Sequence, residues 1–184
     1  VLGSILQFPE RERRIGVAAS IFPGPVALSE HLGKLPPAVF VAGTCMHSGK
    51  TRAACALIRE ATACGLKVGA AKITGVALRR DTLEMIDHGA VVAFSFADAG
   101  LPSTCDGEVL SVAKGCLNHL AAEEVDLMVV ELGDGLLGEY GVMDILADAE
   151  IKAAVGGLIL AAGDPVGAWG GQQLLLNMGL SATV

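Results

Sequence analysis

The segment Val41–Ala54, with the sequence VAGTCMHSGKTRAA, limits the fold more than any other part of the chain. Small residues allow a backbone to turn its N–H groups toward an anion, a lysine can reach the outer phosphates of a nucleotide, and a hydroxyl can hold Mg²⁺. The common phosphate-binding loop has four residues between its first glycine and the Gly-Lys pair. Five intervene here between Gly43 and Gly49, so Thr44 takes the place of that first glycine.

The residues on either side give this loop its expected context. Residues 38–42 form a short apolar run typical of a strand, and residues 50–64 carry apolar side chains at helical spacing until Gly65 ends the helix. A strand, a loop and a helix in this order predict nucleotide binding, whereas a plain glycine turn with a solvated lysine is the alternative. The predicted nucleotide-binding residues are Gly43, Thr44, Cys45, Met46, His47, Ser48, Gly49, Lys50 and Thr51.

Composition favours an α/β protein with a mostly parallel central sheet. Hydrophobic residues make up 52% of the 184 residues, with 24 glycines, which suits a sheet buried on both faces and joined by tight turns. The net charge of −7 argues against a nucleic-acid partner. No apolar run is long enough to span a bilayer, so we expect no membrane association. Five cysteines without a CxxC pair suggest reduced thiols and a cytoplasmic location.

We expect two parts in the chain. Residues 1–36 contain two strand-like runs around a polar turn, which predicts a β-hairpin arm or the end of an upstream domain. Residues 37–184 form the predicted nucleotide-binding domain. Residues 181–184 begin another strand, so we expect this domain to be truncated at its C-terminus, and a start at Val1 suggests that an upstream segment was removed.

Charged side chains follow the expected second strand, residues 66–71. Lys72 stands at its carboxyl end, where ligands gather in open α/β sheets, and is either a ligand for phosphate or carboxylate or a surface residue. Arg79, Arg80 and Asp81 combine two guanidinium groups with a possible Mg²⁺ ligand. The alternative is an exposed helix start with Asp81 as the N-cap.

The second half of the chain predicts a pocket segment and an acidic strand end. Residues 93–104 are too apolar for a free loop and too broken for a strand, as is typical of segments that line pockets. A helix is expected from Asp106 to about Ala122, and further strands at 126–131 and 153–161. Glu131 ends the first of these strands, where a buried carboxylate needs a cation such as Mg²⁺ nearby, unless it reaches water.

Several of these pieces together resemble the dethiobiotin synthetase-like family of P-loop NTPases. The loop GTCMHSGKT has that family's length and Gly-Thr opening, and AAKITG, RRDT, FSFADAGLPS and VVELGDGLLG follow in the family's order. The resemblance covers about residues 38–184. It implies the three-layer sandwich of P-loop NTPases, with a mostly parallel central sheet between two helical layers. It also implies ATP and Mg²⁺ as cofactors, a homodimer, Thr44 and Lys50 on phosphate, Lys72 on the substrate, and Thr51, Asp81 and Glu131 around Mg²⁺.

Some residues depart from the family's pattern. Cys45 replaces an acidic residue of the loop, and the segment after Glu131 is bulkier and more acidic than in the family. His47 and the Arg79-Arg80 pair have no counterpart, and we interpret His47 as solvent-facing. A divergent relative with a different substrate is therefore indicated, and not an orthodox dethiobiotin synthetase.

The sequence leaves more than one function open. The leading hypothesis is an ATP- and Mg²⁺-dependent enzyme of the ligase type that phosphorylates a carboxylate or carbamate of a small molecule. Lys50, Lys72 and Glu131 are its predicted catalytic residues, and Lys72, Arg79 and Arg80 its predicted substrate contacts. The alternatives are a nucleotide-dependent switch or assembly ATPase with a protein partner, and a nucleotide-binding module without turnover.

Overall fold

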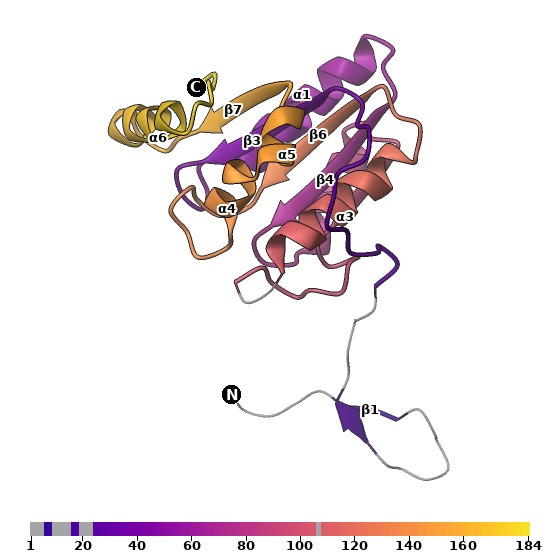
Figure 1. Cartoon of the computed structure of the whole chain (residues 1–184). Helices are drawn as coiled ribbons and strands as arrows, with labels where there is room; N and C mark the ends of the chain where they lie inside the picture. The colour runs from indigo at the N-terminus through magenta and orange to yellow at the C-terminus, as the bar shows by residue number, and fades with distance from the viewer. Residues whose placement is uncertain (1–5, 9–15, 19–23, 106–107) are drawn as a thin grey trace.

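A computed structural model describes residues 6–8, 16–18, 24–105 and 108–184, and places the larger part of them in an α/β sandwich (Figure 1). Five parallel strands form the central sheet in the order β5-β4-β6-β3-β7. They are β3 (Ala38–Gly43), β4 (Val68–Thr74), β5 (Val92–Ser95), β6 (Leu127–Leu132) and β7 (Gly157–Ala161). The parallel sheet with helical layers confirms the predicted P-loop NTPase-type fold.

Helices cover both faces of this sheet. They are α1 (Lys50–Ala63), α2 (Arg79–Asp87), α3 (Val109–Ala121), α4 (Val142–Ala147), α5 (Ala149–Ala154) and α6 (Pro165–Asn177). One apolar cluster joins α1 and α2 to the sheet, and a larger one joins the other helices to the opposite face (Figure 1). None of the helices in the described ranges is both long and apolar enough to cross a bilayer.

The N-terminal arm is described only in part. Strands β1 (Leu6–Gln7) and β2 (Val17–Ala18) pair antiparallel in a separate sheet, as the predicted hairpin requires. The expected polar turn and the outer parts of both strands lie outside the described residues, as does Asp106, the expected cap of α3.

Two expectations about elements were wrong, and one alternative does not hold. Residues 92–95 do form a strand, β5, because an edge strand next to β4 tolerates a short and broken apolar pattern. Residues 149–154 form α5, so β7 begins only at Gly157; Asp148 caps that helix by accepting hydrogen bonds from two backbone N–H groups. The alternative with Asp81 as an N-cap does not hold, because helix α2 begins at Arg79 and Asp81 lies inside its first turn.

A charge cluster joins the segment before β3 to the helical layer. Lys114 on α3 is 6% exposed, and its Nζ lies 2.9 Å from Asp148 Oδ2 and 2.8 Å from Glu150 Oε2. The same ammonium donates to the backbone carbonyl of Glu30, and His31 contacts the other oxygen of Glu150. This cluster fastens residues 30–32 against α3 and α5.

We predict that the stability contributed by Lys114 is lost in acid. The Lys114 ammonium holds the pKa of Glu150 down at about 2, against an ordinary value of 4.5. Its stabilising effect is therefore fully present above the ordinary pKa and lost as the pH falls toward the depressed one. Thermal midpoints of the wild type and Lys114→Met, measured from about pH 6 to about pH 3, should converge as the pH falls. A gap between the two proteins that stays constant would contradict this role.

Candidate functional site

The loop between β3 and α1 has the backbone that an anion site requires. Gly49 precedes α1 with φ 101°, and His47 also has a positive φ of 59°, so the chain turns tightly before the helix. Glycine cannot supply a side-chain cap, which leaves the first N–H groups of this 14-residue helix available to an anion. A Cβ at Gly43 would lie 2.4 Å from Ser48 Oγ and 2.7 Å from Lys50 Cδ. Only glycine therefore fits at position 43 without moving these two side chains.

Lys50, the lysine of this loop, is buried at the start of α1. Lys50 is 6% exposed, and its Nζ donates a 2.8 Å hydrogen bond to the carbonyl of Cys45. Burial lowers the pKa of Lys50, while the carboxylates of Glu131 and Asp134 act in the opposite direction. Cys45, Met46 and His47 are exposed, which agrees with the interpretation of His47 as solvent-facing. Met46 and His47 also line the cleft around Lys50.

Glu131 meets the loop from the neighbouring strand. Strand β6 pairs with both β3 and β4, and this register places Glu131 beside Val41 and Lys72. Glu131 is 2% exposed, and its Oε1 accepts a 3.0 Å hydrogen bond from Thr51 Oγ1. Its Oε2 is buried and has no hydrogen-bond partner among the described residues. Burial raises the pKa of Glu131, against the opposing influence of Lys72 and Thr51.

Asp81 is held by a lysine. It is 5% exposed and forms an ion pair with Lys72, which is itself 7% exposed at the carboxyl end of β4. Arg80 approaches the other oxygen of Asp81 only at 3.9 Å, with an 80% exposed side chain. The pair explains how two charged groups can be buried here, because each neutralises the other.

The predicted metal ligands are brought together in part. Thr51 and Glu131 are in direct contact, and the free Oε2 of Glu131 is a buried oxygen of the kind that Mg²⁺ prefers. Asp81 is engaged by Lys72 and would have to exchange this partner to reach a metal. In the described ranges no group of three or more His, Cys, Asp or Glu side chains could hold a metal ion. These residues suit Mg²⁺ that is held by one or two protein oxygens and completed by phosphate and water.

These residues surround one cleft of about 330 Å³, here called the phosphate cleft. It is lined among others by Lys50, Thr51, Lys72, Arg80, Asp81 and Glu131. Arg79 does not line it; this residue lines a neighbouring cavity of about 360 Å³ together with Ser95 and Asp98. The three predicted substrate contacts are therefore divided between two cavities, because consecutive residues on a helix point in different directions.

Sequence reasoning missed how closely residues 133–136 follow the loop. A Cβ at Gly135 would lie 2.6 Å from the carbonyl oxygen of Thr44, and Leu136 N donates to the carbonyl of Gly43 at 2.8 Å. Asp134 adopts a positive φ of 66° and lines the phosphate cleft. The glycines on both sides of Asp134 were the available indication of this close approach.

Comparisons with known proteins support the fold. The kinase domain of the Escherichia coli tyrosine kinase ETK matches with a TM-score of 0.55 and 16% identity over 79% of this chain and 64% of that one. The cell division protein FtsY from Thermotoga maritima matches with a TM-score of 0.54 and 16% identity, over 86% of this chain and 52% of that one. The signal recognition particle receptor FtsY from Elizabethkingia anophelis matches with a TM-score of 0.52 and 14% identity, over 82% of this chain and 50% of that one.

These comparisons reach no further than the P-loop NTPase fold. The chain spans between half and two thirds of the length of these three structures. No family model matches the chain, and no curated protein matches its sequence. The comparisons therefore support the fold that this resemblance implies, and not the dethiobiotin synthetase-like family itself.

We predict that Glu131 reduces the stability of the ligand-free protein. Its carboxylate is buried with one oxygen unpaired, which is unfavourable. Glu131→Gln should raise the free energy of unfolding by about 1 kcal/mol, or the thermal midpoint by roughly 2–4 °C, because the amide is neutral and can still accept from Thr51. Thermal melts without nucleotide test this, and a lower midpoint for the variant would show that the carboxylate is stabilising.

Proposed function

We propose that this chain is an ATP- and Mg²⁺-dependent enzyme that phosphorylates a carboxylate or carbamate of a small molecule. The observation that carries the proposal is the contact between Thr51 and Glu131 beside the uncapped start of α1. A hydroxyl, a buried carboxylate with a free oxygen and a row of backbone N–H groups are the parts that a nucleotide with its metal needs.

The buried charged residues of the phosphate cleft have distinct roles in this proposal. The N–H groups at the start of α1 and the Lys50 ammonium would hold the β- and γ-phosphates. Thr51 and Glu131 would hold Mg²⁺, which when bound neutralises charge on the transferred phosphoryl group. Lys72 would hold the acceptor carboxylate, since its ammonium lies at the same edge of the sheet.

The proposed reaction is an in-line phosphoryl transfer. An acceptor oxygen attacks the γ-phosphorus, forms the new P–O bond, and breaks the bond to the oxygen that bridges the β- and γ-phosphates. The products are a nucleoside diphosphate and an acyl phosphate, which a later amide-forming or ring-closing step could consume. Lys72 would leave Asp81 when it binds the acceptor, and Asp81 would then be free to join the metal.

The decisive experiment is a screen of small carboxylic acids for stimulation of ATP or GTP hydrolysis by the full-length protein. We expect at least one acid to raise turnover in the wild type and none to do so in Lys50→Ala, because the truncated side chain cannot reach the phosphates. Stimulation by a protein partner and by no acid would refute the enzyme proposal and favour the nucleotide-dependent switch.

Two aspartates of α2 allow a matched test of the cleft. Asp81 is 5% exposed and faces Lys72, whereas Asp87 at the end of the same helix is exposed. We predict that Asp81→Asn lowers nucleotide turnover by about 10- to 100-fold and weakens Mn²⁺ binding in the presence of nucleotide, while Asp87→Asn changes neither. Turnover assays and electron paramagnetic resonance of bound Mn²⁺ would measure both effects. Equal behaviour of the two variants would remove Asp81 from the site.

A further inference from the structure

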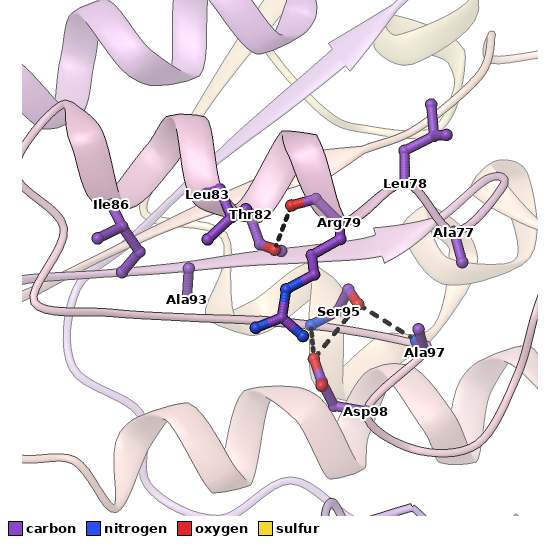
Figure 2. Close-up of a pocket in the computed structure, with 10 residues that line it drawn as sticks. All are labelled: Ala77, Leu78, Arg79, Thr82, Leu83, Ile86, Ala93, Ser95, Ala97 and Asp98. Atoms are coloured by element: carbon purple, nitrogen blue, oxygen red, sulfur yellow. Dashed lines mark hydrogen bonds between the residues drawn. The ribbon is translucent and has the colours of Figure 1, made fainter. Parts of the chain in front are cut away.

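The cavity beside the phosphate cleft has features of a second binding site. This side pocket of about 360 Å³ lies between one face of α2 and the end of β5, and Arg79, Ser95 and Asp98 line its polar side (Figure 2). Its volume is in the range of small-molecule sites. Leu78 lines both this pocket and the phosphate cleft, so the two cavities adjoin at this residue.

Two opposite charges face the side pocket without pairing to each other. The Arg79 guanidinium extends from the start of α2 toward the turn at residues 95–98 (Figure 2), yet no ion pair or hydrogen bond of this group occurs among the described residues. Asp98 uses Oδ2 to accept from Ser95 N at 2.7 Å and from Ser95 Oγ at 3.3 Å. Its Oδ1 accepts no hydrogen bond from the described residues, so a guanidinium fork and a carboxylate oxygen are both available to a ligand.

The turn that carries Asp98 is firmly placed. Val26 N donates to the carbonyl of Asp98 at 2.9 Å, and Asp98 N donates to the carbonyl of Ser95 at 2.9 Å. A Cβ at Gly24 would lie 2.0 Å from the carbonyl oxygen of Asp98, so residues 24–26 lie directly against this turn. Phe96 between the two polar residues is fully buried. The carboxylate therefore has a fixed position relative to the sheet, as a recognition site needs.

An apolar wall completes the pocket. Arg79, Thr82, Leu83 and Ile86 lie at helical spacing on the face of α2 that lines the cavity (Figure 2). Leu83 is 48% exposed and Ile86 39% exposed, although α2 buries its other face through Asp81 and Met85. Apolar side chains left half-exposed over a cavity gain stability when an apolar ligand covers them.

From this arrangement we propose that the side pocket binds a free amino acid with an apolar side chain. The ligand carboxylate pairs with Arg79, its ammonium pairs with Asp98, and its side chain packs on Leu83 and Ile86. A guanidinium group matches a carboxylate in geometry. A zwitterion of zero net charge can pair with the Arg79 guanidinium and the Asp98 carboxylate at the same time. The inference goes beyond the proposed function, because it depends on the side pocket alone and not on nucleotide turnover.

Isothermal titration calorimetry with the nucleotide-free chain tests this inference, with leucine as the probe. Isocaproate lacks the ammonium of leucine and isoamylamine lacks its carboxylate. We expect leucine to bind at least about tenfold more tightly than either analogue, because each analogue leaves one charged wall unpaired. No binding of leucine at millimolar concentration, or equal binding of isocaproate, would overturn the proposal.

The two neighbouring arginines provide the matched control. Arg79→Gln should weaken leucine binding by about tenfold and leave isoamylamine binding unchanged, while Arg80→Gln, at the phosphate cleft, should change neither. Asp98→Asn should weaken the binding of leucine and leave the binding of isocaproate unchanged. The amide oxygen of the new asparagine can still accept the hydrogen bonds from Ser95. Equal losses in the two arginine variants would refute the site. Lys50→Ala should bind leucine normally, so failure of the nucleotide proposal would be seen separately from failure of this one.

Discussion

Four buried charges at the carboxyl edge of the sheet govern this structure. Lys50, Lys72, Asp81 and Glu131 are each at most 7% exposed, although they stand at the end of an apolar parallel sheet. Charges in such a place are tolerated only when they compensate each other. Lys72 and Asp81 do so through their ion pair. Lys50 and Glu131 influence each other only through the field, because Lys50 donates to the carbonyl of Cys45 and Glu131 accepts from Thr51.

Some polar groups at the phosphate cleft remain without partners in the described part of the chain and are available to a ligand. The Oε2 atom of Glu131 and the hydroxyl of Ser48 are buried without partners among the described residues. The first N–H groups of α1 also lack a side-chain cap. Unpaired polar groups in a cleft disfavour the ligand-free protein and favour any ligand that pairs them, which is how a binding site differs from a structural ion pair. The unpaired Oε2 of Glu131 agrees with its proposed role at the metal.

Local pattern was sufficient for the elements that have strong periodicity and clear ends. Helix α1 runs from Lys50 to Ala63, with Ala54, Ile58 and Ala61 buried as their spacing predicted, and Gly65 follows it with a positive φ of 87°. Asp164, a favoured N-cap residue directly before Pro165, caps α6 by accepting hydrogen bonds from the backbone N–H groups of Val166 and Gly167. The predictions for the short elements β5 and α5 were wrong, because these elements are stabilised by their neighbours more than by their own sequences. A four-residue edge strand and a six-residue helix contain too few residues to show a period.

The sequence by itself determined the phosphate loop, the strand before it and the helix after it, and the arrival of Lys72 and Glu131 at one edge of the sheet. These depend on spacing along the chain and on the rule that parallel strands end together. Only the tertiary structure decided the partners: Asp81 pairs with Lys72, and Arg79 faces a different cavity from Arg80. The reason is that a side chain's direction depends on where its helix begins and against what it packs. A shift of one residue along a helix turns a side chain by about 100°.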